Sequence, residues 1–188
     1  MRALSVRRAG SASGPAPGAG DFAGVYERHF PSIHRYIAGR LGRDVADDIA
    51  ADTFVIALRK HDGFDARRGP VGAWLYGIAT NLIAQHRRTE QRRYRALARA
   101  RAGPLTGEHE DRVLSSAAAQ DLQPRLAAAL ASLSPEERDV LLLVALADLS
   151  HEEISQALDI PYGTVGSRLN RAREKIRATL DPGGQADG

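Results

Sequence analysis

The sequence predicts an all-α fold of two small helical domains joined by a flexible linker. Apolar residues recur every three or four positions over most of the chain, which is the period of one helix face. No run of β-branched residues alternates with polar ones between turn signals, so we expect no strand. Hydrophobic residues make up 43% of the chain and aromatic ones only 5%. The core should therefore consist mainly of Leu, Ile, Val and Ala.

The two ends of the chain have compositions unsuited to a packed core. Residues 1–20 are rich in Gly, Ser, Pro and Ala, and no apolar run follows their arginines. We expect a disordered tail there rather than a signal peptide, and a second short tail at residues 182–188. No run of about 18 apolar residues occurs, so we expect no membrane insertion. The absence of Cys excludes disulfides and thiolate metal sites.

The first predicted domain covers residues 21–95 and contains three helical segments. In the first segment, residues 21–41, we expect Pro31 to break or kink the helix and to open its second piece. The second helix is predicted over residues 45–60. A loop rich in Gly, Pro and Asp follows, and the third helix begins near Val71 and continues into a run of arginines.

The second predicted domain, residues 123–181, follows a linker at residues 96–122 that has no sustained apolar stripe. After a short helix over residues 123–133, the segments "SPEE" and "SHEE" each place a Ser at an N-cap with a Glu three residues later. This is the capping-box pattern, in which the two residues satisfy each other's free backbone amides. Helices should therefore begin near Pro135 and His151.

The segment "IPYGTVGSRLNRAREKIR" follows the His151 helix. Its first four residues, "IPYG", are predicted to form a short turn and a second helix to begin at Thr164, so the pair is a helix-turn-helix. In its second helix, apolar residues spaced four, three and four apart form one buried stripe: Val165, Leu169, Ala172 and Ile176. The other faces are polar and basic. A helix of this kind can lie in the major groove, with side chains near its N-terminus on base edges and flanking cations on phosphates.

Charge is distributed unevenly along the chain, although the net charge is only +3. Residues 87–101 hold seven Arg and one Glu, and residues 164–177 hold five basic residues and one Glu. An acidic segment, residues 107–121, lies between them. Two separate basic segments indicate two contacts with a polyanion.

Two long segments resemble the two domains of bacterial sigma factors of the extracytoplasmic-function (ECF) group, which belong to the sigma-70 family. "LASLSPEERDVLLLVALADLSHEEISQALDIPYGTVGSRLNRAREKIR" resembles their C-terminal DNA-binding domain. "DVADDIAADTFVIALRKHDGF", followed by "WLYGIATNLIAQHRR", resembles their N-terminal domain. The resemblance implies a cytoplasmic specificity subunit of RNA polymerase that needs no cofactor or metal and has no catalytic residue of its own.

The resemblance also implies partners. They are core RNA polymerase, through the clamp helices of its β′ subunit and through its β subunit, and promoter DNA. An anti-sigma factor is a common further partner in the family, and no residue of this chain identifies one.

Three groups of site residues follow from the same resemblance. Core polymerase would contact Asp48, Asp52 and Phe54; for Phe54, a place in the hydrophobic core is an equal alternative. The −10 element, as a melted strand, would be read by Arg67, Arg68, Asn81, Gln85, Arg87 and Arg88. The −35 element would be read by Thr164, Ser167, Arg168, Arg171 and Arg173. Gly166 departs from the family, where Lys or Arg is frequent, so −35 readout should depend on Ser167, Arg168 and Arg171.

Three other classes of protein are alternatives to a sigma factor. The sequence has no HExxH, phosphate loop or GxSxG motif, which argues against an enzyme. The alternative is an autonomous helix-turn-helix regulator that acts without core polymerase, or an interaction protein that mimics a sigma factor. Promoter-specific transcription by added core polymerase separates these from a sigma factor.

Overall fold

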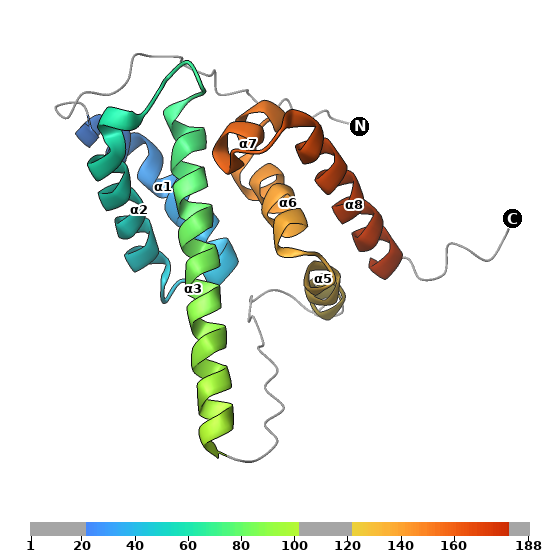
Figure 1. Ribbon diagram of the computed structural model, residues 1–188. Helices are drawn as coiled ribbons and strands as arrows, with labels where there is room; N and C mark the ends of the chain where they lie inside the picture. The colour runs from blue at the N-terminus through green and yellow to red at the C-terminus, as the bar shows by residue number, and fades with distance from the viewer. Residues whose placement is uncertain (1–21, 102–121, 181–188) are drawn as a thin grey trace, which may run out of the picture.

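The computed structural model describes residues 22–101 and 122–180, and all regular elements in these ranges are helices. The first range holds α1 (Phe22–Leu41), α2 (Ala46–Lys60), a 3₁₀ turn η2 (His61–Gly63) and α3 (Val71–Arg101). The second holds α5 (Leu122–Ala131), α6 (Pro135–Ala147), α7 (His151–Leu158) and α8 (Tyr162–Leu180). The predicted all-α fold is confirmed (Figure 1). The predicted tails and most of the predicted linker lie outside the described residues.

The first three helices pack around a core of aliphatic and aromatic side chains. The largest fully buried members are Ile33, Tyr36 and Ile37 of α1 and Leu75 and Ile83 of α3. Small residues of α2, such as Ala50 and Ala57, are also fully buried and let the helices approach closely. Burial of each large apolar side chain stabilises the fold by roughly 1.5–3 kcal/mol.

Pro31 does not break α1, so the predicted second piece is absent, while the predicted kink stays a prediction. The helix runs unbroken from Phe22 to Leu41 with Pro31 inside it. Proline removes its own backbone donor, which would have bonded the carbonyl of Glu27, and its ring crowds that carbonyl. Both Glu27 and Pro31 are exposed, so water can take that carbonyl. The Ser32 hydroxyl also donates to the carbonyl of His29 at 2.9 Å, which satisfies a neighbouring acceptor.

Helix α3 is longer than the predicted first domain. It continues past Arg95 to Arg101, so residues 96–101, which the sequence placed in the linker, are helical. Ala, Leu and Arg are strong helix formers, and neither Gly nor Pro occurs in this stretch. The second half of α3 projects beyond the other helices (Figure 1), and its residues 91–96 are all exposed.

The helices of the second range begin where their caps predict. The Ser134 hydroxyl accepts from the Glu137 amide at 3.2 Å, and the Glu137 carboxylate accepts from the Ser134 amide at 3.0 Å. Ser150 and Glu153 form the same pair of bonds at 3.2 and 2.8 Å. Both predicted capping boxes are therefore present. Helix α8 begins at Tyr162, two residues earlier than predicted.

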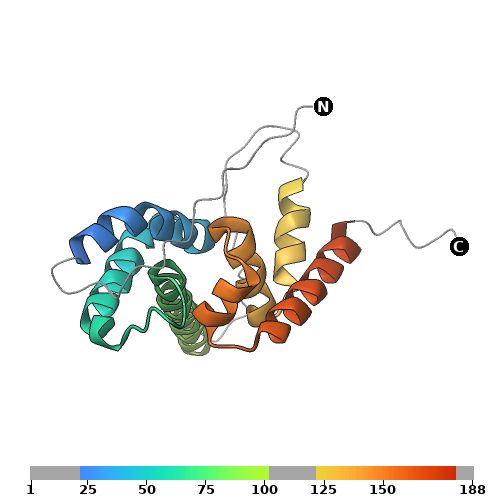
Figure 2. The same cartoon turned by 90° about the horizontal axis from the view of Figure 1, so that it is seen from above.

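The two groups of helices contact each other directly. Helix α7 lies beside α3, and α6 contacts α1 (Figures 1 and 2). A polar network crosses the α1–α6 contact. Arg40, whose side chain is 3% exposed, donates to the Tyr36 hydroxyl at 2.7 Å and pairs with Asp139 of α6. The Tyr36 hydroxyl also lies 2.9 Å from the hydroxyl of Thr80 in α3.

Candidate nucleic-acid interface

The loop between η2 and α3 is held by an aromatic pair and a charged turn. Phe64 stacks on Trp74, with ring centroids 5.1 Å apart and ring planes inclined by 38°. Arg67 donates through Nε and Nη2 to the two oxygens of Asp65, each at 2.9 Å. These bonds lower the pKa of the Asp65 carboxyl. The Arg67 side chain is still 91% exposed, so it can also reach a ligand.

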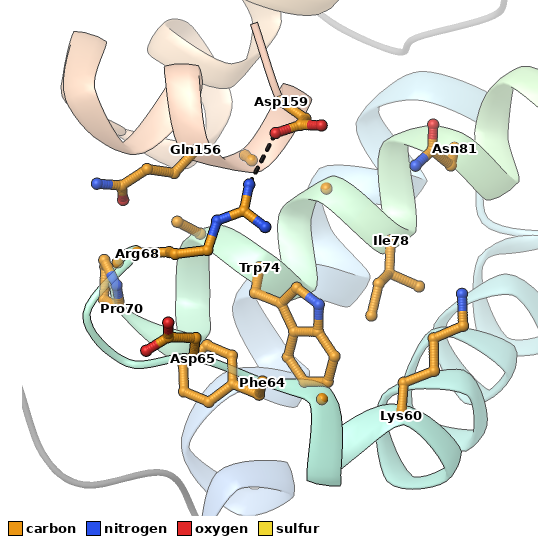
Figure 3. Close-up of a pocket in the computed structure, with 15 residues that line it drawn as sticks. Lys60, Phe64, Asp65, Arg68, Pro70, Trp74, Ile78, Asn81, Gln156 and Asp159 are labelled. Carbon is orange, nitrogen blue, oxygen red and sulfur yellow. Dashed lines mark hydrogen bonds and ion pairs between the residues drawn. The ribbon is translucent and has the colours of Figure 1, made fainter.

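A pocket of about 310 Å³ opens beside this loop. Phe64, Arg68 and Trp74 line one part of it, and Asn81 lies further along α3 (Figure 3). Lys60, from the end of α2, adds a second cation. An aromatic pair, two cations and an amide are the groups that bind single-stranded nucleic acid, because bases stack on rings and phosphates attract cations. The structure thus brings Arg68 and Asn81 into one site.

Gln85 does not line this pocket. It lines a second hollow of about 230 Å³, together with Ile49, Asp52 and His86. Asn81 and Gln85 are both exposed and four residues apart on α3, as expected, but they border different concavities. Gln85 is therefore next to Asp52, which the sequence assigned to polymerase binding.

Among the arginines at positions 87–95 of α3, Arg87 has an internal partner and the others are exposed. Arg87 is half-buried and donates through Nη2 to the carbonyl of Arg40 at 2.8 Å. Arg88 is exposed. Arg93 pairs with Glu90 at 3.0 Å in an exposed contact. Arg88 is therefore better placed than Arg87 to bind a phosphate.

The candidate polymerase surface lies on the outer face of α2. Asp48 and Asp52 are exposed, and Val55 and Leu58 beside them are 44% and 45% exposed. Phe54 is only 4% exposed and packs on the ring of Tyr26 at 4.9 Å. Of the two roles that the sequence left open, Phe54 occupies the core, so any effect on polymerase binding would be indirect.

The helix-turn-helix presents its predicted polar face. Val165, Leu169 and Ala172 are buried, and Ile176 is half-buried. Of the five residues predicted to contact the −35 element, Ser167, Arg171 and Arg173 are exposed. Thr164 and Arg168 are half-buried. The Arg171 Nε donates to the carbonyl of Ser167 at 3.3 Å, and its long side chain remains available at the surface.

Two features of α8 were missed by sequence reasoning. Tyr162 was read as part of the turn, but it is the first residue of α8, is 62% exposed and lies 6.0 Å from the His151 ring. Pro161 directly before it was the available signal for the helix start. Lys175 reaches across to Glu137 of α6 at 2.7 Å. That ion pair and the Ser134 bond lower the pKa of Glu137.

Neither a metal site nor a membrane span is visible in the described part of the chain. No cluster of three or more His, Asp or Glu side chains able to bind a metal occurs there. Within residues 22–101 and 122–180, none of the helices combines the length and apolar character that crossing a bilayer requires.

Comparison with known proteins finds the same two segments. Residues 25–93 match the family "Sigma-70 region 2", and residues 124–176 match "Sigma-70, region 4". The chain is 32% identical over 170 residues to the ECF RNA polymerase sigma factor SigW of Bacillus subtilis, covering 85% of this chain and 88% of SigW. It is 30% identical over 151 residues to the ECF RNA polymerase sigma factor SigC of Mycobacterium tuberculosis, covering 80% and 78% of the two chains.

A solved structure has a similar fold. It is that of CnrH in complex with the cytosolic domain of CnrY. The likeness has a TM-score of 0.59 at 27% identity, and covers 89% of this chain and 92% of that one.

Proposed function

Because the chain belongs to the sigma-70 family, in its ECF group, we propose that it binds core RNA polymerase and directs promoter recognition and transcription initiation. The observation that carries this proposal is the presence of both sigma regions in one chain, in order. A regulator that bound DNA alone would not need a region 2. The protein acts as a transcription factor, and the chemistry of RNA synthesis belongs to the polymerase.

The work is divided between two proposed domains. Residues 21–95 would form the domain that contacts core polymerase through Asp48 and Asp52 and reads the −10 strand at the Arg68–Asn81 pocket. Residues 123–181 would read the −35 element with the exposed face of α8. The likeness to CnrH, which is solved in complex with the cytosolic domain of CnrY, supports a protein partner for this chain, and we propose that this partner is an anti-sigma factor. Since core polymerase is the partner, the proposed location is the cytoplasm.

Reconstituted transcription tests the proposed function. The purified chain is added to core RNA polymerase with a library of promoter sequences, and transcript starts are mapped. We expect specific starts that share a −10 and a −35 motif. Specific binding to duplex DNA without polymerase, together with no specific starts, would instead establish the autonomous regulator.

Two single variants test which residues of the −10 surface recognise bases and which bind phosphates. Asn81→Ala removes an amide that can bond a base edge, so the preferred −10 sequence should change. Arg88→Ala removes a cation that contacts any phosphate, so all promoters should weaken alike and the dependence of binding on salt should become less steep. Identical behaviour of the two variants would contradict the assignment.

A further inference from the structure

The face of α3 that carries the two predicted −10 amides continues as a row of arginines. Its members are exposed and follow one another at intervals of four, three, four and three residues: Asn81, Gln85, Arg88, Arg92 and Arg95. This spacing keeps all of them on one narrow face of a helix. With a rise of about 1.5 Å per residue, the face is about 21 Å long. Its last three residues form what we call the arginine stripe.

The arginine stripe extends onto an arm, residues 91–101, where α3 projects beyond the other helices (Figure 1). Residues 91–96 are all exposed, so packing within the described part of the chain does not account for the arginines among them. The match to sigma-70 region 2 ends at residue 93. The arm therefore continues past the segment that the family model covers, and its surface needs an explanation of its own.

Exposed arginines beside the −10 pocket have acidic partners within the chain. The guanidinium of Arg67 lies 2.9 Å from the carboxylate of Asp65. That of Arg68 lies 2.8 Å from the carboxylate of Asp159, at the end of α7 (Figure 3). The charge of both arginines is therefore partly neutralised before any ligand binds.

The arginine stripe has no such partner. The single acid of residues 87–101, Glu90, pairs with Arg93 at 3.0 Å. Glu90 lies two residues from both Arg88 and Arg92, and therefore on the opposite side of the helix. Among the described residues, no ion pair neutralises the three arginines of the stripe. Like charges three or four residues apart repel each other and weaken a helix, and a bound polyanion would relieve that repulsion.

The arginine stripe suits duplex DNA better than a melted strand. It presents guanidinium groups without an aromatic ring, whereas splayed bases need rings on which to stack. Successive phosphates of one duplex strand are about 3.4 Å apart along the axis, so a face of about 21 Å would span about six base pairs. The stripe also shares its face with Asn81 of the −10 pocket, so DNA bound at the pocket would continue onto it.

We propose that the arginine stripe binds the phosphates of duplex promoter DNA directly upstream of the −10 element. Residues 102–121 connect the arm to the helices that would read the −35 element, which favours the upstream side. This proposal rests on the proposed function, because it takes the pocket at Asn81 to be the −10 site. The stripe would add a contact that does not depend on sequence between the two contacts that read bases.

Binding of forked DNA to the chain in complex with core polymerase isolates the arginine stripe. Two templates carry the same single-stranded −10 element and no −35 element, and one of them has about six more base pairs of upstream duplex. The longer template should bind about tenfold more tightly. Arg92→Ala and Arg95→Ala should each reduce this gain about twofold. Each should also lower the slope of log affinity against log salt by about one for the longer template.

Arg93→Ala is the matched control, because Arg93 is exposed on the same arm, carries the same charge and lies off the stripe. It should leave both the gain and the salt slope unchanged. All three variants should keep the thermal unfolding midpoint, since exposed substitutions change stability little. An equal loss in Arg92→Ala and Arg93→Ala would indicate diffuse attraction and overturn the proposal. So would an unchanged gain in the double variant Arg92→Ala, Arg95→Ala.

Site-directed cleavage tests which polyanion lies on the arm. The chain contains no Cys, so a single Cys at the exposed position Ala96 can carry an iron chelate that cuts nearby chains. With core polymerase and a promoter, the cuts should fall within about six base pairs upstream of the −10 element. The same chelate at exposed Ala23, at the start of α1, should leave this stretch intact. Cuts in RNA or in a polymerase subunit instead of this duplex would overturn the proposal.

Failure of the arginine stripe and failure of the proposed function can be told apart. Specific transcript starts with core polymerase, together with a gain that Arg92→Ala and Arg95→Ala leave intact, would refute the stripe and leave the proposed function in place. Absence of specific starts would refute the proposed function, and the role of the stripe at a promoter with it.

Discussion

Removal of the Asp139 carboxylate should destabilise the protein more than removal of any exposed acid. Asp139→Ala leaves the Arg40 guanidinium buried, with a side chain only 3% exposed, and Arg40 Nε already has no partner among the described residues. Breaking a buried ion pair by deleting one member typically costs 3–5 kcal/mol. Asp139 itself is 19% exposed, and Arg40 keeps its bond to Tyr36, so we expect a loss of about 3 kcal/mol.

Urea denaturation followed by circular dichroism measures this loss as a lower free energy of unfolding. Asp159→Ala is the comparison, because it deletes the acid of an exposed pair and should cost at most about 1 kcal/mol. The double variant Arg40→Met, Asp139→Leu removes both buried charges and should recover most of the lost stability. If Asp139→Ala costs no more than Asp159→Ala, the Arg40–Asp139 pair is not buried in solution, and the described packing of α1 on α6 is wrong.

Three further predictions concern α2, α8 and its support. Asp48→Lys with Asp52→Lys should abolish binding to core polymerase in a pull-down while leaving the thermal unfolding midpoint unchanged, because both side chains are exposed; unchanged binding would remove the polymerase assignment. Gly166→Ala should raise the free energy of unfolding by about 1 kcal/mol, since the position is helical and a Cβ there meets no other atom. Gly166→Arg should in addition tighten −35 binding, or change its preferred base, by about 1–3 kcal/mol if the side chain reaches a guanine. No effect of Gly166→Arg on binding would mean that the position faces away from the groove. The bonds to Lys175 and Ser134 lower the pKa of Glu137, so the stability they provide is present above the ordinary Glu pKa of about 4.3 and is lost as the pH falls through the lower folded-state value. Glu137→Gln should therefore reduce the loss of unfolding free energy at acid pH, as measured by urea denaturation. An unchanged dependence of stability on pH would show that the pair does not form.

Local features of the fold were predictable because they depend on residues close in sequence. The caps at Ser134 and Ser150 and the buried stripe of α8 need only neighbours within one or two helical turns. The break predicted at Pro31 does not occur, because the outcome there depends on the surroundings of the helix in the folded chain rather than on neighbouring residues. A propensity rule counts the lost hydrogen bond, whereas whether water can take the freed carbonyl depends on which side of α1 faces solvent.

Contacts between distant segments explain what sequence reasoning missed in the candidate site. The sequence could nominate Arg68 and Asn81, but no local pattern indicates that Ala157 and Asp159 complete their pocket from about eighty or ninety positions away. In the same way, the bond from Arg87 to the Arg40 carbonyl distinguishes Arg87 from Arg88, although the two are adjacent and chemically identical. From sequence alone, a glycine in a helix, such as Gly77, predicts only a less stable helix. The structure shows that the backbone of Ala157 packs against it.

The unequal surroundings of α3 bear on how its sequence can change over evolutionary time. Its first half is fixed by the core, since residues such as Leu75 and Ile83 are fully buried. Residues 91–96 of its projecting half are all exposed, and exposed substitutions usually change stability little. Selection can therefore adjust the number and spacing of arginines on this arm separately from the packing of the domain. One continuous helix thus combines a segment constrained by packing with a segment whose substitutions can change the affinity for DNA.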